Sequence, residues 1–181
     1  PVQLRGDVNS DYWEGSISLS ADEHVIYFSS ERLGGYGGKD IYRAELMPDG
    51  SWGNVKNLGA TINTDKAEDA TFIHSSGLFL IYSSNGRNTL GGYDIFMTDL
   101  VNDTSWAEPV SLGWPINTPG DDIYYVLAAD GKRGYYSSGK PGGNGLQDIY
   151  LVEPGILGAK IALVQVSGQI TLDEKPVKCE I

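Results

Sequence analysis

The chain has 181 residues, which is enough for one large domain or for one domain with a small appendage. A hydrophobic content of 40% excludes a disordered protein, and a net charge of −11 argues against nucleic acid or an anionic membrane surface as the main partner. Cys179 is the single cysteine, which excludes an internal disulfide framework, and no apolar run reaches the roughly 18 residues that a membrane helix needs.

The main feature of the sequence is a repeat of 54 residues without insertions or deletions between copies. Each copy contains a pair of serines, a glycine-rich loop and then Asp-Ile-Tyr or Asp-Ile-Phe. The aspartates of the three copies are Asp40, Asp94 and Asp148. A fixed period of this length indicates a repeat architecture, in which each copy forms one structural unit. Leu4 already aligns with Leu58, so we expect the chain to be part of a longer protein.

The pattern of a complete unit predicts four short strands. The first strand begins at an acidic residue, and these residues are Glu14, Glu68 and Asp122. The second strand is an aromatic and β-branched run such as 25–28, and the third begins at the repeated aspartate. The fourth carries Trp52 in the first unit and Trp106 in the second. Four short strands, each taking about 13 residues with its connecting turn, are typical of one blade of a β-propeller.

The period ends after Tyr150, which leaves the third unit without a fourth strand. Residues 161–170 and 173–177 then predict a strand, a polar turn and another strand. The predicted fold is therefore all-β. We assign residues 1–155 to propeller blades, and residues 156–181 to a linker and the first strands of a β-sandwich domain.

Several segments resemble a known family of repeats. They are Ile26–Ser30, Asp40–Tyr42, Gly50–Trp52 and Asn57–Thr64. These segments are similar to WD40-like propeller repeats of the TolB type, in the version found in Bacteroidetes envelope proteins of the OmpA family. That group includes the peptidoglycan-associated component of the type IX secretion system. Residues 166–177 are similar to the start of the carboxypeptidase-regulatory-like β-sandwich that follows the propeller there.

The resemblance implies a periplasmic protein associated with the outer membrane. It implies other envelope proteins as partners, and a peptidoglycan link through an OmpA-like domain that is not in this chain. Three units cannot close a ring, because propellers have four to eight blades. We therefore expect the remaining blades to come from an upstream segment or from a second copy of the chain. We also expect apolar side chains on the outer faces of the first and third blades.

The repeated polar residues have structural interpretations. We expect Asp40, Asp94 and Asp148 to accept hydrogen bonds from the glycine-rich loops, which lack the Gly-Lys-Ser/Thr of a phosphate site. The acidic residues that open the innermost strands are expected at the mouth of the central channel. Three carboxylates fall short of the six to eight oxygens that Ca²⁺ takes, and His24 and His74 are not equivalent, so no metal and no cofactor are predicted.

The aromatic residues divide into two groups. Trp52 and Trp106 recur and are expected to pack between strands or blades. Trp13 and Trp114 do not recur and lie on loops between blades, where they either contact a partner or cover the blade below. The predicted partner-binding residues are Trp13, Trp114, Arg32, Arg87 and Tyr36.

These features favour a non-enzymatic, protein-binding scaffold of the cell envelope. The alternatives are a propeller glycoside hydrolase, the gating propeller of a peptidase, or a carbohydrate-binding lectin. A glycosidase needs an unrepeated pair of carboxylates about 5 to 10 Å apart. The sequence offers no clear pair of this kind, whereas a lectin would use the loop aromatics alone.

Overall fold

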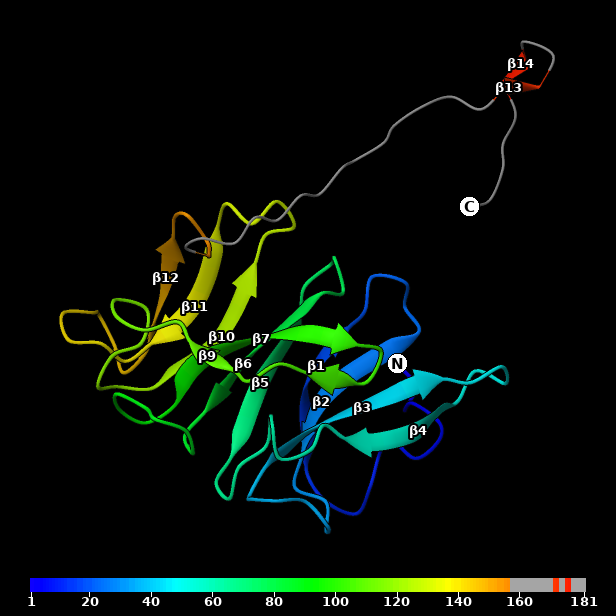
Figure 1. Cartoon of the computed structure of the whole chain (residues 1–181), viewed down its shortest axis with the longest axis horizontal. Helices are drawn as coiled ribbons and strands as arrows, with labels where there is room; N and C mark the ends of the chain where they lie inside the picture. Colours follow the sequence, from blue (N-terminus) through cyan, green and yellow to red (C-terminus); the bar gives the residue numbers. More distant parts are fainter. Residues whose placement is uncertain (157–170, 173–174, 177–181) are drawn as a thin grey trace.

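The computed structural model describes residues 1–156, 171–172 and 175–176. All regular elements in these residues are strands of antiparallel sheets (Figure 1), which confirms the all-β prediction. Within the same residues there is no helix long and apolar enough to span a membrane.

The first unit folds as blade 1, a four-stranded meander in which each strand pairs with the next. Its strands are β1 (Glu14–Leu19), β2 (Val25–Ser30), β3 (Asp40–Leu46) and β4 (Trp52–Asn57). The β2 run Val-Ile-Tyr-Phe is apolar at successive positions and is buried almost throughout, because both faces of the blade are covered. Gly50 makes the turn into β4 with a φ of 76°, which glycine adopts at little cost.

Blade 2 repeats this order with one difference in its outermost strand. Its strands are β5 (Glu68–Ile73), β6 (Phe79–Ser84), β7 (Asp94–Asn102), β8 (Ser105–Trp106) and β9 (Val110–Ser111). β8 and β9 both pair with β7 and together take the place of β4. Pro109, where blade 1 has Val55, lies between these two pieces and has no N–H to continue the ladder.

Blade 3 contains three strands. They are β10 (Asp122–Leu127), β11 (Gly134–Ser138) and β12 (Asp148–Val152). In the described part of the chain, β12 is therefore the open edge of its sheet, where blades 1 and 2 continue into a fourth strand. β13 (Thr171–Leu172) and β14 (Lys175–Pro176) form a short antiparallel pair. The rest of the β-sandwich predicted for 156–181 lies outside the described residues.

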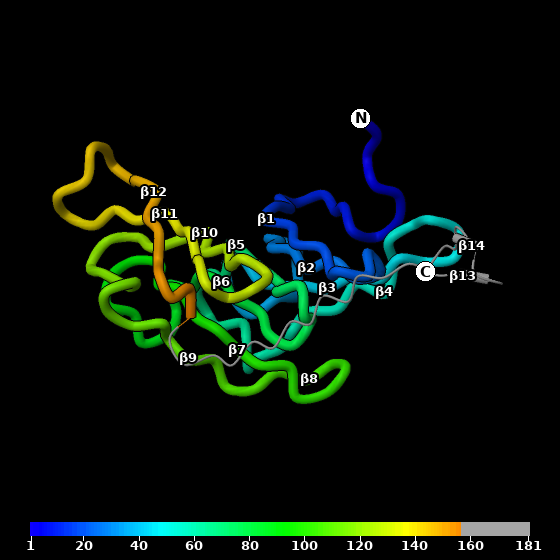
Figure 2. Tube along the Cα trace, turned by 90° about the horizontal axis from the view of Figure 1, so that it is seen from above, coloured from blue at the N-terminus to red at the C-terminus, as the bar shows by residue number. Residues whose placement is uncertain are grey.

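Figure 2 shows the three blades side by side in chain order. Two apolar clusters join them. The cluster between blades 1 and 2 contains Tyr27, Ile41, Ile62, Ile73, Leu80, Tyr82, Phe96 and Trp106. The cluster between blades 2 and 3 contains Phe79, Ile81, Ile95, Ile116, Tyr125, Leu127, Tyr136 and Ile156. Trp52 and Trp106 are both buried, as predicted.

The outer faces of the terminal blades differ from each other. Val8 of the N-terminal segment packs on blade 1 against Ile26, Phe28, Tyr42, Ala44 and Trp52, all of which are buried. The prediction of an apolar face exposed on blade 1 is therefore wrong for most of that face, because residues 4–9 lie on it. On blade 3 the prediction is correct, since Ile149 is 81% exposed and Leu151 is 54% exposed.

The innermost strand of each blade has a β-bulge at the same repeat position. The bulge places Ser16, Ala70 and Tyr124 at φ values of 49°, 55° and 59°, in the left-handed region. These residues line a hollow of about 200 Å³ that β1, β5 and β10 share. The bulge is therefore a repeated feature of the innermost strands.

Replacing Trp106 by Ala tests whether the blades depend on each other. Trp106 is 8% exposed and makes an edge contact with Tyr27 of blade 1, with ring centroids 5.9 Å apart. We expect Trp106→Ala to lower the free energy of unfolding by about 3–5 kcal/mol in urea titrations. Trp114→Ala is the matched control, because Trp114 is 74% exposed, and it should cost less than about 0.5 kcal/mol. Equal losses would contradict this packing.

Candidate binding face

One end of the blades is formed by loops that are hydrogen-bonded to one another. These are the loops between the second and third strands of each blade and the connections between blades. The N–H of Glu68 donates to the carbonyl of Lys39 at 2.8 Å, and the equivalent bond joins Asp122 to Tyr93 at 2.7 Å. We call this end of the molecule the loop face.

The repeated aspartates hold the glycine-rich loops of this face. Asp40 accepts hydrogen bonds from the N–H groups of Tyr36 at 2.6 Å and Gly37 at 3.0 Å. Asp94 accepts one from Leu90 and Asp148 one from Asn144, both at 2.7 Å. Each carboxylate therefore fixes the path of its own loop, and the side chains on the loop are presented from a defined backbone.

The acidic residues that open the inner strands are turned into their own blades. Glu68 is fully buried and accepts hydrogen bonds from the N–H and hydroxyl of Thr64 and from the hydroxyl of Ser84. Burial raises the pKa of Glu68. Asp122 is also fully buried and bonded to Thr118. These carboxylates fasten the connection between blades to the next inner strand.

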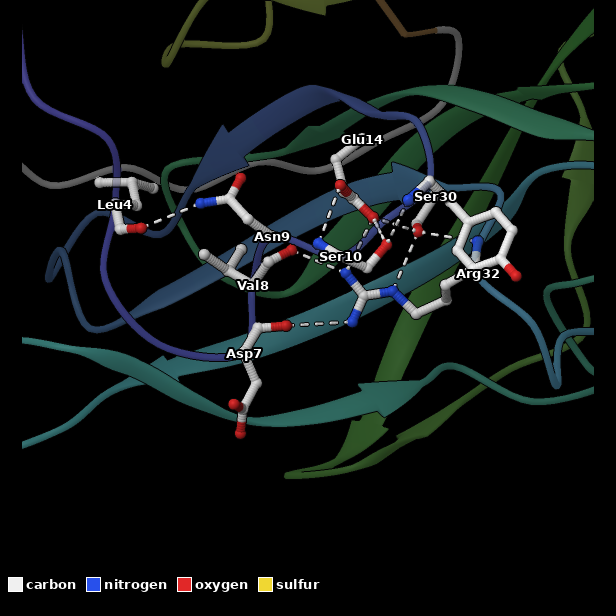
Figure 3. Close-up of polar contacts among 9 residues, drawn as sticks. Leu4, Asp7, Val8, Asn9, Ser10, Glu14, Ser30 and Arg32 are labelled. Carbon is white, nitrogen blue, oxygen red and sulfur yellow. Dashed lines mark hydrogen bonds and ion pairs between the residues drawn. The ribbon is translucent and has the colours of Figure 1, made fainter.

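Glu14 belongs to the corresponding network of blade 1 (Figure 3), which includes Ser10, Ser30 and Arg32. Within the described residues, no group of three or more His, Cys, Asp or Glu side chains is placed to hold a metal ion.

Two of the predicted binding residues, Arg32 and Arg87, point inward. The guanidinium of Arg32 donates to the carbonyls of Asp7 and Val8 and forms an ion pair with Glu14 at 3.2 Å (Figure 3). Arg87 donates to the carbonyls of Thr61 and Ile62, which occupy the equivalent positions in the repeat. Each side chain is 14% exposed. Both arginines therefore hold the connecting segment that enters their blade.

The structure also brings together a cluster that the sequence analysis missed. The ammonium group of Lys39 lies 3.9 Å from the ring centroid of Trp13 and 2.7 Å from a carboxylate oxygen of Asp69. The other oxygen of Asp69 accepts a hydrogen bond from the hydroxyl of Ser16 at 2.5 Å. Ser16 lines the central hollow, so its bond to Asp69 puts these side chains beside the opening of that hollow. We call Trp13, Lys39 and Asp69 the mouth cluster.

The ionisation of the mouth cluster follows from its contacts. Burial alone would raise the pKa of Asp69, but hydrogen bonds from Lys39 and Ser16 hold it below its ordinary value. Burial alone would lower the pKa of Lys39, but the hydrogen bond to Asp69 raises it above its ordinary value. Both groups are therefore charged at neutral pH, and the ammonium group of the pair lies against the ring of Trp13.

The signal for this cluster in the sequence is its departure from the repeat. Position 13 is Trp in one unit and Ala or Asp in the others, and position 39 is Lys, Tyr or Gln. Position 69 is aspartate, where the other units have Gly15 and Ile123. Three unrepeated positions that meet at one point distinguish the junction of blades 1 and 2 from the junction of blades 2 and 3.

The loop face also exposes large apolar side chains. Trp114 is 74% exposed, Tyr36 is 53% exposed and Trp13 is 42% exposed. The neighbouring loops add three exposed leucines, Leu33, Leu90 and Leu146. Of the five predicted binding residues, the three aromatic ones are therefore accessible, and the two arginines support the loops from inside.

No known family model matches the sequence, and no curated protein is similar to it. Solved structures resemble the fold. TolB from Acinetobacter baumannii is 19% identical with a TM-score of 0.53, over 77% of this chain and 29% of that protein. A putative TolB from Agrobacterium tumefaciens is 12% identical with a TM-score of 0.56, over 81% of this chain and 47% of that protein.

A third similar structure is an α-L-arabinofuranosidase from Lactobacillus brevis. It is 14% identical with a TM-score of 0.56, over 85% of this chain and 52% of that protein. The chain thus spans from less than a third to about half of the length of these structures. The blades have the fold of a TolB-type β-propeller, of which the described residues form a part.

The pH dependence of Asp69→Asn tests the ion pair of the mouth cluster. The pKa of Asp69 is lower in the folded protein than its ordinary value of 3.8. The ionised carboxylate therefore stabilises the fold at pH values above 3.8, and this stabilisation is lost as the pH falls through the pKa of the folded state. We expect Asp69→Asn to cost about 1–2 kcal/mol in urea titrations near pH 7 and progressively less as the pH falls below 3.8. Asp130→Asn is the control, because its pair with Lys132 is exposed. An Asp69→Asn cost that does not change with pH would contradict the ion pair.

Proposed function

We propose that this chain is the propeller part of a non-enzymatic, protein-binding scaffold of the bacterial cell envelope. The observation that carries the proposal is the set of exposed Trp13, Tyr36 and Trp114 on a loop face whose backbone is held by hydrogen bonds to the carboxylates of Asp40, Glu68 and Asp122. Large aromatic side chains on a rigid surface are typical anchors of protein interfaces, because they bury much apolar area at a low entropic cost.

The location in the envelope rests on the sequence resemblance. The repeat motifs resemble those of Bacteroidetes OmpA-family proteins, and the two TolB structures support the same type of propeller. We propose that the chain lies in the periplasm in association with the outer membrane. Its partners are other envelope proteins, including those of a type IX secretion system, and its peptidoglycan link lies in a domain outside this chain.

A propeller glycoside hydrolase is the second candidate, and the similarity to the arabinofuranosidase fold is the observation in its favour. The carboxylates described above argue against it. Asp40 and Glu68 are buried and hydrogen-bonded inside their blades, and Asp69 is held by Lys39. A general acid needs a raised pKa and access to the substrate, and none of these three carboxylates combines both.

Site-directed photocrosslinking tests the scaffold. A photoreactive amino acid at Trp114 or Leu146 on the loop face is expected to capture an envelope protein in cells of the source bacterium. The same probe at Leu78 or Val101 is the control, because both are exposed at the opposite end of the blades. The captured protein is then purified and titrated, and Trp114→Ala should weaken its binding about tenfold or more. Equal capture from both ends would overturn the proposal.

An activity assay separates the scaffold from the hydrolase. We expect no release of aryl alcohol from aryl α-L-arabinofuranosides or other aryl glycosides, because no accessible acid–base pair is present among the carboxylates described. Turnover that is lost in Asp69→Asn, with the circular dichroism spectrum unchanged, would favour the hydrolase. Binding of an oligosaccharide that Trp114→Ala abolishes, without turnover, would favour a lectin.

A further inference from the structure

Two Asn-Gly sequences occur in the chain, and both lie in glycine-rich loops of the loop face. They are Asn85-Gly86 in blade 2 and Asn144-Gly145 in blade 3. This sequence is chemically labile, because the backbone nitrogen of the glycine can attack the side-chain carbonyl carbon of the asparagine. Glycine has no Cβ that would shield its nitrogen or restrict the backbone dihedral angles that the attack needs.

Asn85 is held in place by the connection between blades 1 and 2. Its carboxamide oxygen accepts a hydrogen bond from the N–H of Ala67 at 3.0 Å, and its own N–H donates to the carbonyl of Ala67 at 3.2 Å. The N–H of Gly86 donates to the hydroxyl of Ser84 at 3.1 Å. A Cβ on Gly86 would overlap the side chain of Thr64, so the backbone is closely packed here. Asn85 can therefore react only after these contacts have opened.

Asn144 lacks these restraints. Its side chain is exposed, and within the described residues its carboxamide has no hydrogen-bond partner. A Cβ on Gly145 would approach no described atom more closely than the carbonyl oxygen of Gln147, at 3.8 Å. The N–H groups of Asn144 and Gly145 donate to Asp148 at 2.7 Å and 3.3 Å. The second bond is long and therefore weak, so little is lost when the nitrogen of Gly145 turns towards the carboxamide.

The repeat gives residue 144 a defined position on the loop face. Asn144 aligns with Tyr36 and Leu90, and the N–H of each donates to the repeated aspartate of its own blade. Tyr36 is 53% exposed and Leu90 is 56% exposed. Each loop therefore displays one side chain at this position from a fixed backbone, and blade 3 displays a labile one.

We propose that Asn144 is a site of spontaneous deamidation, which converts the loop of blade 3 into a second covalent form. The nitrogen of Gly145 forms a bond to Cγ of Asn144, and the bond between Cγ and Nδ2 breaks. The amide proton of Gly145 leaves with Nδ2 as ammonia, and a cyclic succinimide remains. Water then opens the ring at one of its two carbonyl carbons, which gives aspartate or isoaspartate.

Both products change the loop face. Each adds a negative charge beside Asp148, whose carboxylate already accepts hydrogen bonds from residues 144 and 145. In isoaspartate the main chain also passes through the side-chain carbons of residue 144, so the N–H of Gly145 is displaced from Asp148. The loop then loses its defined path, and Leu146, which is 96% exposed, is presented differently.

The chemistry of this site is independent of the proposed function, and only its effect on a partner rests on that function. Deamidation at Asn144 in a protein that captures no partner would support this inference and count against the scaffold. The equivalent positions of blades 1 and 2 carry tyrosine and leucine, which have no carboxamide. The change is therefore confined to one of the three loops.

Peptide mapping by mass spectrometry on the full chain measures the reaction. The protein is incubated at mildly alkaline pH, and the proteolytic fragments that contain residues 85 and 144 are analysed separately. We expect Asn144 to lose its amide nitrogen at least about tenfold faster than Asn85, because Asn85 must first break both hydrogen bonds to Ala67. In urea these contacts are absent, so the two rates should become similar.

Hydrogen exchange tests the effect on the loop. In the incubated protein, the amides of residues 144 and 145 should exchange faster than in fresh protein, because the bonds to Asp148 are disturbed. Asn144→Gln is the matched control, since its longer side chain cyclises much more slowly, and its loop should not change with time. Equal or faster loss at Asn85 in the folded protein, or no loss at Asn144 while the unfolded chain reacts at both positions, would each overturn the proposal.

Discussion

The arrangement of the blades depends on hydrogen bonds between a buried asparagine and the edge of the preceding blade. The N–H and C=O of Ile41 and Ile95 are at the end of a strand and buried, so leaving them unpaired would cost a substantial part of the folding free energy. A carboxamide satisfies both groups at once, because it carries a donor and an acceptor. Asn63 and Asn117 therefore fix the spacing between blades, and the apolar clusters and loop face follow from that spacing.

Most of the fold follows from positions that repeat. A residue kept in every unit has the same neighbours in every blade, so the strand order, the burial of Trp52 and Trp106 and the blade boundaries are predictable from the 54-residue period. The division of the last strand of blade 2 was not predicted, although its cause is one residue, Pro109. The cover over blade 1 was missed although the repeat contains it, because Val8 aligns with Ile62 and Ile116, which pack on the following blade in the same way.

The candidate site was less predictable, because it is made of contacts between units. Trp13, Lys39 and Asp69 come from different strands and loops of two blades, and their meeting depends on how those blades are spaced. Arg87 illustrates a related limit. It holds the same backbone positions as Arg32 but is displaced by one residue in the repeat, where Leu33 stands in the first unit. Arginine is long enough to absorb this displacement, so alignment by period does not show the equivalence.

The proposed scaffold offers the same backbone in each blade, so any discrimination between partners has to come from the side chains that do not repeat. The carboxylates that hold the loops are common to all blades and cannot distinguish one junction from another. Trp13, Lys39, Asp69 and Trp114 can, because each occurs at one junction of the described arc. The buried repeated residues give the loop face its rigidity, and the unrepeated ones on that face give it a chemical identity. Specific binding requires both, since an anchor on a mobile loop would lose much of its affinity to the cost of ordering that loop.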